Sequence, residues 1–154
     1  MVLTRKLGAA VPILVCMLAA QPAAAQYGSV PAENNAAFAE GQDWGATPLT
    51  KGERLMCAAY WYVWSELVEE VFDERDRAEL VPALTKAAAS NAADFWAMEI
   101  AREERVEVNE LSEPTMASLR EQMDTAWDYA EGVAYGEDHG LVRVLGACEP
   151  PPEE

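Results

Sequence analysis

Apolar residues recur every three or four positions over most of the chain beyond residue 50, and this is the periodicity of helices that bury one face. Thr50 and Glu53 have the spacing of a capping box, in which each side chain accepts a hydrogen bond from the other residue's backbone N–H. A helix is therefore predicted from Lys51 to Phe72. Its apolar positions form two stripes that cover more than half of its circumference, which predicts a central helix with several neighbours.

The second predicted helix begins near a proline. Pro82 is tolerated in the first turn of a helix but breaks a helix interior, so a helix start or a kink is expected near Val81–Pro82. From Ala83 the apolar positions again follow helical spacing as far as Ile100. Ser and Asn favour turns and caps over helix interiors, so Ser90–Asn91 is the expected point of a break into two helices.

Ser112 is expected to cap a third long helix, which ends at Gly132 and Gly136. The segment Leu141–Leu145 is one more helical turn or a short extended piece. Strand patterns are almost absent, and no internal repeat is visible. The predicted fold class is all-α, a small bundle of three long helices plus one or two short ones.

The first 25 residues have the pattern of a secretory signal. Arg5 and Lys6 form a positive start, Leu7 to Ala20 is an apolar run, and Ala23 to Ala25 supply the small residues of a cleavage site before Gln26. A cleavable signal peptide is therefore predicted over residues 1–25, and the protein is expected in the periplasm of a bacterial envelope or outside the cell.

Two alternatives to cleavage are an uncleaved anchor and a lipoprotein. A spanning helix needs roughly 20 apolar residues, and Pro12 interrupts this shorter run. Lipid attachment at Cys16 would favour Gly or Ala at the preceding position, where this chain has Val15. Both alternatives are therefore disfavoured, and no stable membrane anchor is expected after cleavage.

The remaining chain divides by composition. Residues 26–49 are rich in Ala, Asn, Gly and Pro with little apolar periodicity, so a flexible, disordered leader is predicted there. Residues 50–149 form the predicted helical domain. Residues 150–154 contain three prolines and two glutamates, and a disordered tail is expected.

Loss of the signal would also remove one of the three cysteines and leave a pair. In an oxidising compartment, Cys57 and Cys148 are expected to form a disulfide. By the chain-entropy model, closing a loop of about 90 residues stabilises the fold by roughly 4 kcal/mol. The alternative is two free thiols or a redox pair, which the absence of a Cys-x-x-Cys spacing disfavours.

The charge balance narrows the choice of partners. The whole chain has 27 acidic and 11 basic residues, and without Arg5 and Lys6 the formal charge falls from −16 to −18. A nucleic-acid-binding protein needs a basic patch to neutralise phosphates, so this class is excluded. An anionic membrane surface is disfavoured for the same reason.

Aromatic residues offer one possible site. The run from Tyr60 to Trp64 is the densest, but consecutive helical residues point about 100° apart and cannot share one pocket. Four tryptophans are candidate walls of a ligand pocket between helices: Trp61, Trp64, Trp96 and Trp127. The competing interpretation is that these rings fill the core of the bundle.

His139, the only histidine, is the one candidate general base, with Asp138 or Glu137 as its partner. A single histidine excludes histidine-rich metal sites, and the acidic stretch after residue 72 lacks the ligand order of a calcium loop. No cofactor fingerprint is present, so neither a metal nor a cofactor is predicted.

Negative charge without a catalytic constellation favours a non-enzymatic protein that binds a basic protein or another cationic partner. The second hypothesis is a small-ligand-binding bundle with an aromatic-lined pocket. The third is a hydrolase-like enzyme that uses His139.

Overall fold

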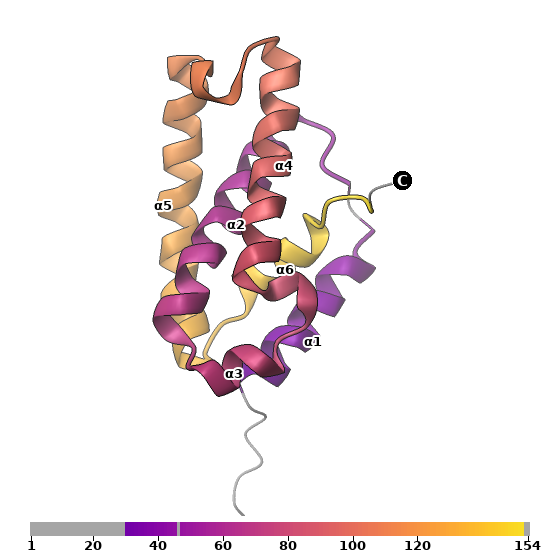
Figure 1. The fold of residues 1–154 in the computed structure, drawn as a ribbon, viewed down its shortest axis with the longest axis vertical. Helices are drawn as coiled ribbons and strands as arrows, with labels where there is room; N and C mark the ends of the chain where they lie inside the picture. Colours follow the sequence, from indigo (N-terminus) through magenta and orange to yellow (C-terminus); the bar gives the residue numbers. More distant parts are fainter. Residues whose placement is uncertain (1–29, 46, 153–154) are drawn as a thin grey trace, which may run out of the picture.

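Helix α2 (Lys51–Val71) runs through the middle of the molecule (Figure 1). The computed structural model describes residues 30–45 and 47–152. The predicted capping box starts α2: the Thr50 hydroxyl accepts from the Glu53 N–H at 3.2 Å, and the Glu53 carboxylate accepts from the Thr50 N–H at 2.8 Å. The backbone N–H of Thr50, followed by that of Leu49, lowers the pKa of Glu53 below its usual range.

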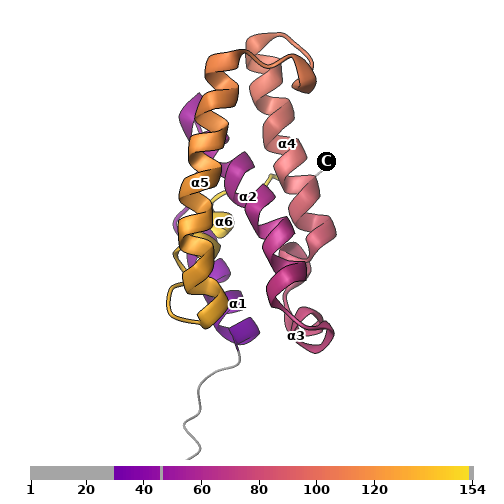
Figure 2. The same cartoon turned by 90° about the vertical axis from the view of Figure 1, so that its left-hand side faces the viewer.

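Helices α4 (Lys86–Glu104) and α5 (Glu113–Tyr135) pack on two sides of α2, as Figure 2 shows. Most apolar residues of the two stripes predicted for α2 are buried, and Trp64 is fully buried, whereas Val71 at the end of the helix is 36% exposed. The prediction of an all-α bundle with three long helices and one disulfide is therefore confirmed.

Shorter elements lie between and after the long helices. They are α3 (Glu74–Glu79), the 3-10 turns η1 (Pro82–Leu84) and η2 (Val108–Glu110), and α6 (Gly140–Ala147). The break predicted at Ser90–Asn91 is wrong: α4 passes through it because Thr85 caps the helix five residues earlier and Ala89 and Ala92 are buried. Gly136 ends α5 at a positive φ of 68°, as predicted, whereas Gly132 lies inside the helix.

A flexible leader is predicted over residues 26–49, and helix α1 (Val30–Asp43) corrects this for residues 30–43, while 26–29 lie outside the described residues. It packs against α6, and Phe38 meets Trp61 edge-on with ring centroids 6.1 Å apart. A Cβ on Gly41 would lie 1.9 Å from the Arg143 carbonyl oxygen, so the two backbones meet where side chains are absent. Small residues make this contact, and the apolar pattern of α1 was therefore too weak to reveal it.

Both ends of the chain extend past the described residues. The predicted signal peptide at 1–25 lies outside them, so its cleavage stays a prediction. Residues 150–152, expected within a disordered tail, lie along α4, while 153–154 lie outside the described residues. Across 30–45 and 47–152, no helix is long and apolar enough to cross a membrane.

Candidate functional site

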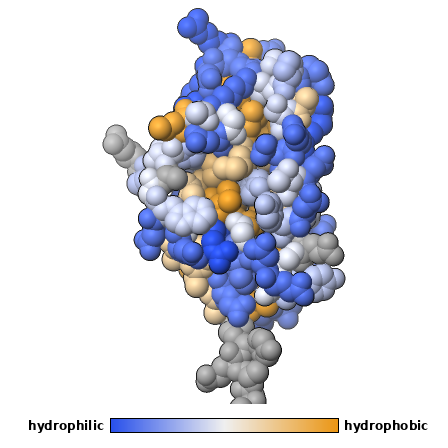
Figure 3. Space-filling view, turned by 180° about the vertical axis from the view of Figure 1, so that it is seen from behind, coloured by the Kyte–Doolittle hydropathy of each residue, from blue (hydrophilic) through white to orange (hydrophobic). Residues whose placement is uncertain are grey.

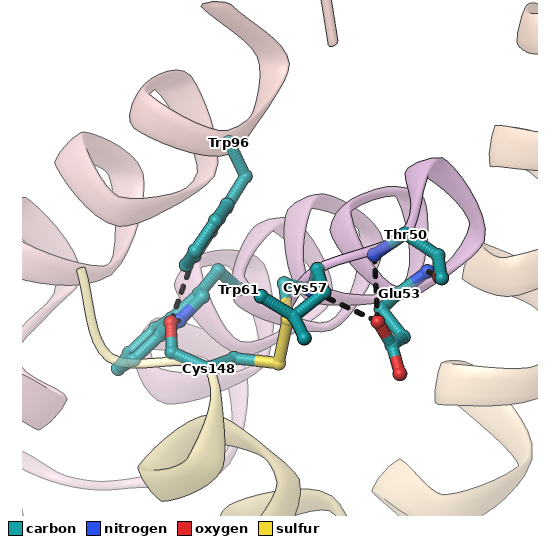
Figure 4. The surroundings of a disulfide bond; sticks show 7 residues. Thr50, Glu53, Cys57, Trp61, Trp96 and Cys148 are labelled. Carbon is teal, nitrogen blue, oxygen red and sulfur yellow. Dashed lines mark hydrogen bonds between the residues drawn. A yellow bond between two sulfur atoms is a disulfide. The ribbon is translucent and has the colours of Figure 1, made fainter. Parts of the chain in front are cut away.

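The predicted disulfide links Cys57 in α2 to Cys148, the residue that follows α6. The two cysteines are 91 residues apart in sequence, and both are buried. Figure 4 shows the bond beside the capping box of α2. The disulfide therefore ties the end of the last helix to the first turns of the central one.

Two indole rings fix the peptide group of Cys148. Trp61 in α2 and Trp96 in α4 each donate a hydrogen bond from Nε1 to the Cys148 carbonyl oxygen, at 2.9 and 2.7 Å (Figure 4). A carbonyl oxygen has two lone pairs, so the two indoles satisfy this buried acceptor fully. Together with the disulfide, these bonds set the direction in which the chain continues from Glu149 to Pro152.

That continuation forms one wall of an elongated groove of about 560 Å³, here called the α4 groove. The opposite wall is the face of α4 that is turned away from α5. The lining residues are Trp61, Ala83, Ala88, Asn91, Ala92, Phe95, Met98, Arg102, Glu149, Pro150, Pro151 and Pro152. Ligand pockets commonly have volumes of about 300–1,000 Å³, so the groove is large enough to bind several side chains or one small molecule.

The α4 wall of the groove is apolar over its middle part. Phe95 is half-buried and meets Trp96 edge-on, with ring centroids 4.9 Å apart, which holds its ring in place. Met98 is 44% exposed, and its flexible thioether can adapt to different partners. Ala88 and Ala92 have short side chains that leave the space between these larger residues and the prolines open.

Polar groups stand at the margins. Arg102 forms an ion pair with Glu99, three residues earlier on α4. Glu149 accepts a hydrogen bond from the Gln42 side chain at 2.6 Å, which links the groove wall to α1. A second hollow of about 450 Å³ also contacts Ala83 and Glu149, so it extends the groove toward α1.

The four predicted tryptophans do not come together around a pocket. Trp61 lines the α4 groove, and Trp96 lies buried behind it. Trp64 is fully buried elsewhere in the core and donates to the Leu84 carbonyl at 2.8 Å. Trp127 lies on α5 and is 38% exposed. Core packing therefore accounts for Trp61, Trp64 and Trp96. Of these three, only Trp61 also lines the groove.

The groove residues that sequence reasoning missed are Phe95, Met98 and the three prolines. Phe95 and Met98 belong to the helical periodicity that extends from Ala83 to Ile100. Their periodicity is real, but the element beside them is a short proline segment and not a helix, so both remain open to a partner. The signal available in the sequence is the position of Cys148, because a disulfide there fixes the point on the bundle from which the prolines continue.

His139 lies between α5 and α6 and faces α1. Its Nδ1 atom is 2.8 Å from Asn34 Oδ1, and its Nε2 atom is 3.4 Å from a Glu33 carboxylate oxygen. Asn34 is fully buried, and its Nδ2 atom has no hydrogen-bond partner among the described residues. Asp138 instead accepts from the Gly140 N–H at 2.8 Å. His139 thus joins α1 to α6 and contacts no nucleophilic side chain in these hydrogen bonds.

A polar cluster joins the start of α2, the end of α4 and the start of α5. Lys51 donates to Glu104 and, at 2.7 Å, to Thr115, while Ser112 donates to Glu104 from both its backbone N–H and its hydroxyl. The bond from Lys51, and then that from Thr115, lower the pKa of Glu104 to about 2. Ser112 holds the predicted N-cap position of α5, but its hydroxyl bonds Glu104 and not the helix amides.

The remaining surface is strongly acidic. Within the described residues, seven lysine and arginine side chains form ion pairs with carboxylates: Lys51, Arg54, Arg75, Lys86, Arg102, Arg120 and Arg143. Most basic groups are therefore neutralised locally, and the acidic surplus determines the outer field. Seen from behind, hydrophilic residues surround an apolar area in the middle of the molecule (Figure 3).

Within the described part of the chain, no three His, Cys, Asp or Glu side chains cluster closely enough to hold a metal ion. No protein family, curated protein or solved structure matches this chain.

Proposed function

We propose that this chain is an exported, non-enzymatic protein that binds a cationic partner. The observation that carries the proposal is the pairing of its basic side chains. Because seven of them already face carboxylates within the fold, a formal charge of −16 for the whole chain leaves many acids available to an outside partner. Such a field speeds the encounter with a positively charged protein and repels anionic surfaces.

Export is supported by two separate features. The first 25 residues have the composition of a signal peptide, and the Cys57–Cys148 disulfide belongs to an oxidising compartment. We propose the periplasm or the exterior of a bacterial cell as the location. Amino-terminal sequencing of the protein recovered from the envelope should begin at Gln26, and recovery of the uncleaved chain from the cytoplasm would contradict the proposal.

The other two functions have less support. A pocket walled by four tryptophans would need rings that converge, whereas Trp64 and Trp127 lie away from the α4 groove. An enzyme that uses His139 would need a nucleophile or a bound water in a cleft beside it, and the partners of this ring are an amide and a carboxylate.

The test is capture of partners from envelope extract at low and at high salt. Immobilised oxidised protein should retain basic proteins at low ionic strength and release them at high ionic strength, because salt screens exposed charges. The contribution of surface charge is tested with a variant of α5. In this variant three exposed acids are changed to their amides: Glu121, Asp124 and Asp128. Retention of neutral and acidic proteins only, at either salt concentration, would refute the proposal.

A further inference from the structure

We propose that the α4 groove binds the apolar face of a cationic amphipathic helix supplied by the partner. The proposal rests on the proposed function and adds to it a site and a chemical form of the ligand. Charge explains why a basic partner approaches, and the groove explains which part of that partner is held.

The shape of the groove matches the apolar stripe of a helix. Asn91, Phe95, Met98 and Arg102 follow one another at intervals of four, three and four residues, so they lie along one face of α4. From Ala88 to Arg102 this face is about 21 Å long at 1.5 Å per residue, which corresponds to roughly four helical turns of a partner. Phe95 and Met98 form apolar contact points near its middle.

The walls of the groove favour a helix over an extended peptide. A peptide that binds as an added strand needs free backbone N–H and C=O groups on its host. The N–H groups of α4 beside the groove are used within the helix, and Pro150, Pro151 and Pro152 have no N–H to donate. A partner must therefore satisfy its own backbone hydrogen bonds, which a helix does, and contribute side chains only.

The charge at the border selects a cationic helix. Two charged residues line the groove, Arg102 and Glu149. Glu99 already neutralises Arg102 in an ion pair, so Glu149 leaves the groove with a net negative charge. A second copy of this chain, with its own charge of −16, is a poor occupant for the same reason.

The disulfide and the two indoles keep the groove open. Trp61 and Trp96 bind the Cys148 carbonyl, and the Cys57–Cys148 bond holds the same residue. The start of the proline wall is thus fixed before a partner arrives, which reduces the ordering of the groove that binding requires.

The binding test uses the full oxidised chain and labelled peptides of about 18 residues. One peptide places leucine at helical spacing among lysines, a second is a scramble of the same composition, and a third replaces lysine with glutamine. Fluorescence anisotropy at low and moderate salt measures each dissociation constant. The amphipathic cationic peptide should bind about tenfold or more tightly than either of the others.

Substitutions locate the contact. Met98→Gln removes an exposed apolar group from the groove, so it should weaken binding of the amphipathic peptide about tenfold and leave the circular dichroism spectrum unchanged. Trp127→Gln is the matched control, since it removes a comparably exposed apolar side chain from α5 and should leave the affinity within about twofold.

The outcomes separate this inference from the proposed function. Equal, salt-sensitive binding of the cationic peptide and its scramble, with no effect of Met98→Gln, would overturn the groove proposal and leave charge-based binding intact. Equal binding of the lysine and glutamine peptides would overturn the requirement for a cation. Binding of a small apolar dye that Met98→Gln abolishes, without binding of any peptide, would assign the groove to a small molecule and overturn the proposal.

Discussion

Trp61 and Trp96 belong to different helices, α2 and α4, and their indole N–H groups donate to one carbonyl oxygen, that of Cys148, at 2.9 and 2.7 Å. One peptide group thereby connects the central helix, its neighbour and the segment after α6. Because Cys148 is buried, no solvent replaces a lost donor at this oxygen.

The two indoles should be energetically coupled. Trp61→Phe and Trp96→Phe each leave the other indole as a donor, whereas the double variant leaves the buried carbonyl without a partner. An unsatisfied buried acceptor costs about 1–3 kcal/mol, so the double variant should lose about 1 kcal/mol more than the sum of the single losses. Urea unfolding of the four proteins measures this, and additivity within about 0.3 kcal/mol would contradict it.

Gly146 should tolerate no side chain. A Cβ on this residue would lie 2.1 Å from the Phe38 carbonyl oxygen, so Gly146→Ala has to push α1 away from α6. We expect a loss of about 1–3 kcal/mol in the free energy of unfolding. Gly52→Ala is the control, because a Cβ on this residue would have open space around it, 4.0 Å from the Thr50 hydroxyl oxygen. This substitution should stabilise α2 by up to about 1 kcal/mol. Thermal unfolding followed by circular dichroism distinguishes them; equal melting temperatures would refute the close approach.

Trp64 and Trp127 should differ in their contribution to stability. Trp64 is fully buried and donates to the Leu84 carbonyl, so Trp64→Ala should cost about 3–5 kcal/mol. Trp127 is 38% exposed on α5, so its ring is only partly buried, and Trp127→Ala should cost less, about 1–2 kcal/mol. Urea unfolding measures both losses. A loss below 1 kcal/mol at Trp64 would show that its ring lies at an interface and not in the core.

Acid should destabilise the fold through Glu104. The pKa of Glu104 is about 2 in the folded chain, mainly because Lys51 donates to it, against a usual value of 4.5. The unfolded chain therefore takes up this proton first, and the contribution of Glu104, complete above pH 4.5, is lost as the pH falls toward 2. Glu104→Gln should show a flatter decline of melting temperature over this interval, and Lys51→Met should raise the pKa of Glu104 toward its usual range. Parallel pH profiles in all three proteins would contradict the assignment.

Parts of this fold can be predicted from sequence because their signals are local or chemically unique. Thr50 and Glu53 define the start of α2 through a contact between residues three positions apart. Cys57 and Cys148 are the two cysteines that lie beyond the predicted signal peptide, and they form the disulfide. Helix α1 could not be predicted in this way. Its stability comes from tertiary contacts of Phe38 and from the missing side chain of Gly41, which leave no apolar periodicity in the sequence.

The candidate site was less predictable, since it depends on which element lies beside each ring. Trp61 and Trp64 have the same residue type and neighbouring positions on α2, yet only the first reaches the groove. The helical spacing of Phe95 and Met98 indicates a face that packs against a neighbour. Nothing in the sequence around these residues shows that the neighbour is a short proline segment. Sequence reasoning therefore found one groove residue among four candidate tryptophans.

The pairing of α1 with α6 has a consequence for the order of folding. Asn34 and His139, which meet between these helices, are 105 residues apart in the chain. During synthesis or translocation, the partner of α1 emerges last; at about 5–20 residues per second, α1 waits roughly 5 to 20 s for it. A chain that is released before α6 is complete would leave Phe38 and the neighbouring apolar face of α2 uncovered, and these truncated chains are the forms that a protease or chaperone would intercept.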